Sequence, residues 1–237
     1  MSSGLHPRGP DAELMKGKHM DNQVRIMGET MHPPLMGAYA QGPAPYQRYR
    51  EMSIEDLLLE NRIIFMAGPI NDRTASLVIM RMLYLQSLKK DQDINLYINC
   101  PGGMVDQTLA IYDTMQHLTC GIATYSIGQA ASGGAVILAA GTKGKRYALP
   151  NSKIMLHQPW GGITGAAEDI RIQAEEILRD KKAMNAILAK HSNMTAEKIE
   201  EETERDRFLD PKEAVEWGLV DEIVEPHVKP DEKKDKK

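Results

Sequence analysis

Ser132 stands at the boundary between a glycine-containing turn, IGQAA (127–131), and a run of small and apolar residues, SGGAVILAA (132–140). A helix over this run puts the serine hydroxyl where unpaired N–H groups and the positive end of the helix dipole lie. That position suits an acyl-transfer nucleophile, because the Gly133 N–H can stabilise the oxyanion formed on attack. A serine at a helix start is also an ordinary N-cap, so both interpretations stay open.

Two polar residues distant in sequence would complete a nucleophilic site. His157 ends the apolar run KIMLH and precedes the turn-rich QPWGG, so a strand can present its imidazole at the edge of a sheet. A weakly activated hydroxyl needs such a base at hydrogen-bond distance. Asp206, between Arg205 and Arg207, would orient the imidazole and stabilise its protonated form. Alternatively, His157 is structural and Asp206 belongs to a surface charge cluster.

A pair of glycines offers a second hydrogen-bond donor. Gly102 and Gly103 follow a predicted strand, and glycine permits close backbone approach and unusual φ values. A backbone N–H there would lie beside a reacting carbonyl. The alternative is an ordinary turn between a strand and a helix.

The elements that must position these residues alternate along the chain after residue 51. Predicted strands are 63–68, 94–99, 122–126, 145–149, 153–157 and 220–224; predicted helices are 74–88, 105–118, 132–140, 165–191 and one that begins after Asp210. Residues 127–131 are predicted to form a turn. This alternation favours parallel strands joined by right-handed crossovers, an α/β layered fold.

The two C-terminal helices carry distinct signals. The long helix 165–191 is amphipathic and needs a surface to cover, in its own domain or on a neighbouring subunit. The last helix is capped by Asp210, has Pro211 in its first turn and stops at Gly218.

Composition divides the chain into one domain and two tails. Residues 1–50 lack hydrophobic periodicity and are predicted to be a flexible tail or propeptide, whose first 20 residues include the leader-like segment SSGLHPRGP. Residues 51–225 form the predicted domain, and residues 226–237 form a charged disordered tail.

Composition also excludes several functions. The net charge of −4, without a basic stripe in the domain, argues against nucleic acid as a partner. No apolar run approaches the roughly 20 residues of a membrane helix. Cys100 and Cys120 indicate neither a disulfide framework nor a zinc site, so we expect a reducing, cytoplasmic location and no metal or cofactor.

Three collinear blocks resemble the proteolytic subunit family of the Clp protease, over roughly residues 52–225. The blocks are YINCPGG, SIGQAASGGAVILAAGTKGKRYALPNSKIMLHQPWGG and TERDRFLDPKEAVEWGLVDEIV. The resemblance implies a crotonase-like fold with a mostly parallel sheet and a projecting handle helix.

The same resemblance implies roles for individual residues. Ser132 matches the family's nucleophile, His157 its general base and Asp206 its orienting carboxylate. Gly103 and Gly133 match the oxyanion-hole positions, although the family commonly has Met where Gly133 stands. Backbone at 103–105 and 160–162 matches edges that bind unfolded polypeptide as an added strand.

The family also implies partners. Two heptameric rings stack into a tetradecamer, with Arg205 and Asp169 paired between rings, and an AAA+ unfoldase of the Clp type docks on the assembly. Asn95 and His117 replace frequent aromatic residues of the docking pocket, whereas Tyr97 is kept, and no axial-loop sequence is recognisable between residues 24 and 50. These departures predict weakened or partner-dependent docking, and they resemble subunits of rings that include a paralogous subunit.

Three functional hypotheses follow from these residues. The first is an active serine endopeptidase. The second is a catalytically modulating subunit of a mixed ring, whose relatives lack one or more triad residues. The third is an acyl-CoA hydratase or isomerase of the crotonase-like fold, which would need an acid or base carboxylate near the oxyanion hole.

Overall fold

The structure, a computed structural model, describes residues 52–225. The predicted N-terminal and C-terminal tails lie outside the described residues. The elements in chain order are α2 (Ile54–Glu60), β1 (Ile63–Ala67), α3 (Asp72–Leu88), β2 (Ile94–Cys100), α4 (Val105–His117), β3 (Ile122–Ala131), α5 (Gly133–Ala139), β4 (Arg146–Ala148), β5 (Lys153–Leu156), α6 (Ala167–His191), α7 (Ala196–Glu202), β6 (Arg207–Leu209), α8 (Pro211–Glu216) and β7 (Glu222–Ile223). The predicted α/β class is confirmed.

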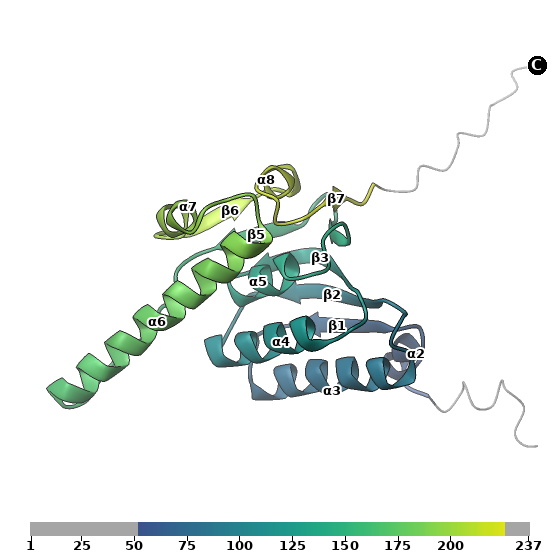
Figure 1. Cartoon of the computed structure of the whole chain (residues 1–237), viewed down its shortest axis with the longest axis horizontal. Coiled ribbons are helices and arrows are strands. Elements are labelled where there is room, and N and C mark those ends of the chain that lie inside the picture. Colours follow the sequence, from purple (N-terminus) through teal and green to yellow (C-terminus); the bar gives the residue numbers. More distant parts are fainter. Residues whose placement is uncertain (1–51, 226–237) are drawn as a thin grey trace, which may run out of the picture. The chain divides into compact units, whose positions relative to one another are not determined.

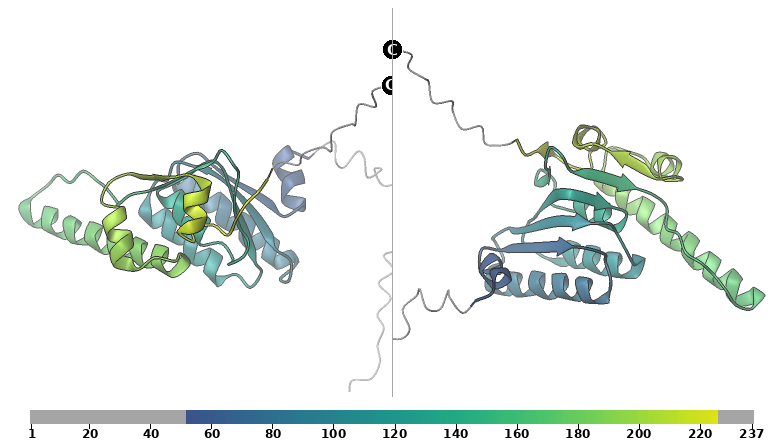
Figure 2. Two further views of the ribbon diagram at one scale, coloured as in Figure 1. Left: turned by 90° about the horizontal axis from the view of Figure 1, so that it is seen from above. Right: turned by 180° about the vertical axis from the view of Figure 1, so that it is seen from behind.

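One mostly parallel sheet organises these elements. Its main path is β1-β2-β3-β4-β7, and β5 pairs in parallel with the last residues of β3. Strand β6 is the exception, because it pairs antiparallel with β5. Helices α3, α4 and α5 cover one face of the sheet, and the view from behind shows the strands in front of α3 and α4 (Figure 1 and Figure 2).

The core lies between the sheet and these helices. Strands β1 and β2 alternate buried and more exposed residues, so Ile64 and Leu96 point inward. Phe65, Tyr97, Tyr125 and Tyr147 occupy one register row of β1 to β4 and stack in sequence on the opposite face. That face therefore carries a continuous aromatic row.

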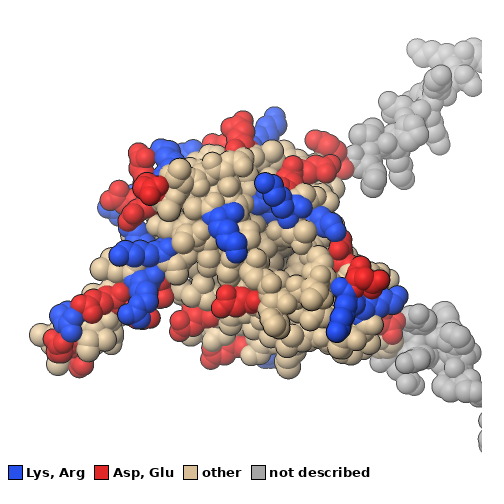
Figure 3. Space-filling model, viewed as in Figure 1, with Lys and Arg blue, Asp and Glu red and all other residues tan. Residues whose placement is uncertain are grey.

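The long helix α6 extends beyond the sheet (Figure 1). It begins at Ala167, two residues after the predicted start, and only its C-terminal part contributes buried side chains, such as Met184 and Leu188. Acidic and basic side chains are interspersed along its projecting part (Figure 3), with Glu168 and Arg171 paired at 2.6 Å. No described helix has the length and apolar character of a membrane-spanning segment.

Helix α8 confirms its predicted signals. The Asp210 side chain accepts hydrogen bonds from the Lys212 and Glu213 N–H groups, Pro211 is the first helical residue, and Gly218 has a φ of +72°. The chain can therefore leave the helix and return to the sheet as β7.

The predicted turn at 127–131 is wrong, because β3 continues through it to Ala131. Gly128 has a φ of +74°, and the pairing register with β2 shifts between Ile98 and Cys100. This irregularity absorbs the glycine and lets residues 129–131 pair with β5. Helices α2 and α7 and strand β6 are further elements that the sequence analysis missed.

Candidate active site

Ser132 lies in a strained turn between β3 and α5. Its φ of 54° and ψ of −124° are unusual for a residue with a side chain. The turn is held because the Ser132 N–H donates to Met155 O of β5 at 2.8 Å, while the Ser132 carbonyl accepts from α5. Ser132 is the N-cap residue of α5 by position, but within residues 52–225 its side chain makes no capping hydrogen bond.

His157 directly follows β5, the strand beside the end of β3. Ala131 is the register partner of Met155, so Ser132 and His157 leave neighbouring parallel strands at the same edge of the sheet. The distance from His157 Nε2 to Ser132 Oγ is 2.9 Å. This is hydrogen-bond distance for a base and a nucleophile.

Asp206 reaches the histidine through β6. Because Leu156 of β5 faces Arg207 of β6 in an antiparallel pair, the residue before β6 lies beside the residue after β5. Asp206 Oδ1 is 3.2 Å from His157 Nδ1, and the Asp206 side chain is 61% exposed against 18% for His157. The structure thus brings together all three predicted polar residues, in an arrangement that can activate a serine for acyl transfer.

The Gly102–Gly103 turn packs directly against the serine. Gly102 has a φ of +95°, and a Cβ built on it would lie 2.5 Å from Ser132 Cβ. Gly102 O accepts from the Ile70 N–H, and Ile70 O accepts from the Met104 N–H, so this turn is fixed to the chain after β1. Among the described residues, neither the Gly103 nor the Gly133 N–H donates to a protein acceptor. Both amides are therefore available to a ligand.

Cys100 supports this turn, a contact that the sequence analysis missed. Its Sγ accepts a hydrogen bond from the Gly102 N–H at 3.3 Å. Burial raises the pKa of the Cys100 thiol, and the Gly102 bond opposes this only partly. The group therefore stays a neutral thiol under the glycine turn.

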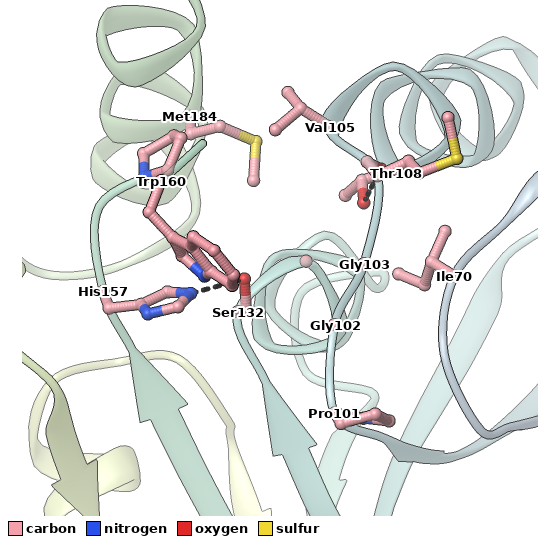
Figure 4. Close-up of a pocket in the computed structure, with 13 residues that line it drawn as sticks. Ile70, Pro101, Gly102, Gly103, Val105, Thr108, Ser132, His157, Trp160 and Met184 are labelled. Carbon is pink, nitrogen blue, oxygen red and sulfur yellow. Dashed lines mark hydrogen bonds between the residues drawn. The ribbon is translucent and has the colours of Figure 1, made fainter. Parts of the chain in front are cut away.

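A cavity of about 460 Å³ opens beside Ser132 (Figure 4). Its lining combines the glycine turn and His157 with side chains from the segment after β1, from α4, from the segment between β5 and α6, and from α6: Ile70, Val105, Thr108, Trp160 and Met184. Sequence analysis did not find Thr108 or Met184, because nothing in their local pattern distinguishes them from core positions. Trp160 also borders a second recess, which contains Asp206 and Arg205.

The chain is similar to known proteins over most of its described length. Residues 46–227 match the protein family described as Clp protease. Over 179 residues, the chain is 53% identical to the ATP-dependent Clp protease proteolytic subunit 1 of Rhodopirellula baltica, which covers 76% of this chain and 79% of that protein.

Proposed function

The chain belongs to the Clp protease family, and from this premise we propose that Ser132, His157 and Asp206 are the catalytic residues with which it hydrolyses unfolded polypeptides. It is a serine peptidase subunit of the Clp type, a hydrolase. One observation carries the assignment of residues: Ser132 Oγ lies 2.9 Å from His157 Nε2, whose Nδ1 faces the Asp206 carboxylate.

The proposed reaction has two halves. Ser132 Oγ attacks the peptide carbonyl carbon while His157 Nε2 takes the hydroxyl proton, and the Gly103 and Gly133 N–H groups stabilise the resulting oxyanion. The C–N bond then breaks as His157 returns the proton to the leaving amine. Water attacks the acyl-enzyme, His157 accepts its proton, and Ser132 is released with that proton.

The same residues argue against the two alternative functions, a non-catalytic subunit and an acyl-CoA hydratase or isomerase. A modulating, non-catalytic subunit would lack a member of the triad, and here all three positions are filled. A hydratase or isomerase would need a carboxylate at the oxyanion site. Within residues 52–225, the lining of the cavity beside Ser132 includes no Asp or Glu.

We propose labelling with a fluorophosphonate as the test. The reagent should attach to Ser132, as mapped by mass spectrometry of the digested protein, and Ser132→Ala should abolish both labelling and peptide hydrolysis. Ser87→Ala, on the exposed end of α3, is the control that keeps both. Labelling that persists in Ser132→Ala would contradict the assignment.

Assembly into two stacked heptameric rings is part of the proposal. Two apolar surfaces of the single chain support self-association. One lies on α3 and the other on the projecting part of α6; they consist of Leu77, Met80, Leu83, Tyr84 and Leu88, and of Ile170, Ile172 and Leu178. The pairing of Arg205 with Asp169 would join two subunits and stays a prediction, as does a ring shared with a paralogous subunit. Native mass spectrometry tests the composition of the rings.

A Clp-type AAA+ unfoldase is the proposed partner. The aromatic row on the open face of the sheet, in which Tyr97 lies between Phe65 and Tyr125, supports docking of an apolar segment. Beside this row, the Tyr125 hydroxyl donates a hydrogen bond to Asn95 Oδ1 at 3.3 Å. We still expect weak or partner-dependent docking, because Asn95 and His117 stand where aromatic residues are frequent. Robust stimulation of protein degradation by one ATPase with this subunit alone would contradict that expectation.

A cytoplasmic location is also proposed. Cys100 and Cys120 are both free and buried, as expected for a protein that folds in a reducing compartment.

A further inference from the structure

Thr108 and Gly133 compete for the same volume at the inner wall of the cavity beside Ser132. Thr108 lies in α4, and Gly133 is the first residue of α5. A Cβ built on Gly133 would overlap Thr108 Oγ1 and would lie 3.1 Å from Thr108 Cγ2 and 3.2 Å from Ile70 Cδ1. The threonine side chain therefore fills the position that a side chain on residue 133 would need.

Thr108 and Gly133 are both buried, and both line the cavity. Thr108 and Gly133 line it together with Ile70, Val105 and Met184, which enclose the space onto which the Ser132 hydroxyl opens (Figure 4). Apart from the threonine hydroxyl, these side chains are apolar. The Thr108 hydroxyl already donates to Met104 O at 2.9 Å, so its contribution to the wall is mainly its volume.

We propose that Thr108 and Gly133 together set the depth of the subsite that receives the substrate side chain on the acyl side of the cleaved bond. This inference rests on the proposed peptidase function, because the acyl carbon must bind Ser132 Oγ with its oxygen at the Gly103 and Gly133 amides. The adjacent side chain then enters the cavity, and Thr108 limits its length. Differences of one methylene in such a pocket change specificity by roughly 10- to 200-fold.

Peptide substrates that differ only at this side chain test the idea with the full-length, assembled protein. Fluorogenic peptides with Ala, Leu, Phe or Trp before the cleaved bond give kcat/KM for each size. Thr108→Ala removes two heavy atoms from the wall and should raise the Trp-to-Leu ratio of kcat/KM at least about fivefold. Thr108→Val keeps the volume and should keep the wild-type ratio, which separates volume from the lost hydroxyl.

Thr114→Ala is the matched control on the same helix. Thr114 Oγ1 donates to Ala110 O at 2.8 Å, the same backbone contact four residues back that Thr108 makes, but Thr114 does not border this cavity. Its substitution should leave both the rates and the size preference unchanged.

The double variant provides an independent test. Gly133→Ala should lower kcat/KM for every peptide, because its methyl group displaces Thr108. Adding Thr108→Ala removes both overlapping atoms. The double variant should therefore have a kcat/KM for the Leu peptide at least about tenfold higher than that of Gly133→Ala alone. If the effects of Gly133→Ala and Thr108→Ala on kcat/KM simply add in the double variant, the proposed competition for volume is overturned.

Labelling distinguishes a failure of the proposed function from a failure of the proposed subsite. A wild-type protein that neither reacts with fluorophosphonate nor cleaves any peptide would overturn the proposed function and this inference with it. If the wild type and Thr108→Ala both label and cleave, but their size preferences coincide, only this inference is overturned.

Discussion

The His157 Nδ1 atom lies 3.2 Å from Asp206 Oδ1, and the aspartate is mostly exposed to solvent. Water can therefore reach the carboxylate, although the histidine itself is largely covered. The orienting role proposed for Asp206 depends on β6, because that strand fixes the backbone beside the end of β5.

Asp206→Asn should lower kcat about a hundredfold or more, with a smaller effect on KM. An amide can hold the imidazole in the wrong tautomer and cannot stabilise its positive charge. Steady-state peptide hydrolysis measures both constants. Glu204→Gln makes the same change of charge two residues earlier. Glu204 borders the recess that also contains Asp206, and its substitution should leave kcat unchanged. Full activity of Asp206→Asn would remove Asp206 from the proposed triad.

Gly102→Ala should abolish hydrolysis by displacing Ser132, the proposed nucleophile. The new methyl group would meet Ser132 Cβ at 2.5 Å, and the residue would keep a φ of +95°. Gly144→Ala is the control for backbone strain alone. Gly144 has a φ of +83°, but apart from its chain neighbours no atom of residues 52–225 lies within 4 Å of the position that its new methyl group would take. The control should lose some thermal stability and keep its activity, and equal losses of activity would refute the steric argument.

How far the sequence predicts this site depends on the range of the interactions. Asp210, Pro211 and Gly218 bound α8 through contacts within a few residues, and the local pattern was enough to predict them. Strand β6 has only three residues, and its partner β5 lies about 50 residues earlier. Local periodicity could not reveal that pair.

Local sequence patterns were also not enough to predict the functional site. The roles of Ser132, His157 and Asp206 came from the family resemblance, because each residue type alone has a common structural explanation. The wall formed by Thr108 and Gly133 depends on how α4 packs against α5, which no local pattern encodes. Similarly, Gly128 has the positive φ of a turn, but pairing with β2 and β5 keeps the chain extended.

Asp221→Asn should strongly destabilise the fold. The Arg146 guanidinium is 5% exposed and donates to Asp221 Oδ1 at 2.5 Å, as well as to backbone carbonyls of Ala139 and His191. Loss of the carboxylate leaves a buried charge without its counter-ion, which costs about 3–5 kcal/mol. Thermal unfolding should show a Tm lower by several degrees. Glu168→Gln breaks an exposed ion pair on α6 and should leave the Tm unchanged; a similar Tm for both variants would contradict the prediction.

His191 should make stability depend on pH below neutrality. Burial lowers its pKa first, and the charges of Lys190 and Arg146 lower it further. The folded protein thus holds a neutral imidazole, whose Nε2 lies 3.2 Å from the Tyr112 hydroxyl. In the unfolded chain His191 binds a proton near pH 6.5. The stability that the neutral imidazole contributes to the fold is therefore complete above that pH, and it is lost as the pH falls toward the pKa of His191 in the folded protein.

Urea unfolding of the wild type and His191→Gln between pH 5 and 8 measures this contribution. The difference in midpoint between the two proteins should shrink as the pH falls below about 6.5. A midpoint difference between the wild type and His191→Gln that stays constant across this pH range would contradict the assigned shift.

Trp160 should become covered when substrate binds. Its side chain is 83% exposed, yet it borders both the cavity beside Ser132 and the recess beside Asp206. A bound peptide in the cavity must therefore contact the indole, and burying an aromatic ring of this size stabilises a complex substantially. Trp160→Ala should raise KM about tenfold and change kcat less.

Fluorescence gives a direct readout, because the chain has only one other tryptophan, Trp217. In the Ser132→Ala, Trp217→Phe variant, a tryptophan-free peptide should shift the emission to shorter wavelength and protect the indole from acrylamide quenching. Circular dichroism checks that the replacement of Trp217, which packs under Arg207, leaves the fold intact. If the emission of Trp160 stays unchanged when the peptide saturates the protein, the indole does not contact the substrate. In that case Trp160→Ala should also leave KM unchanged.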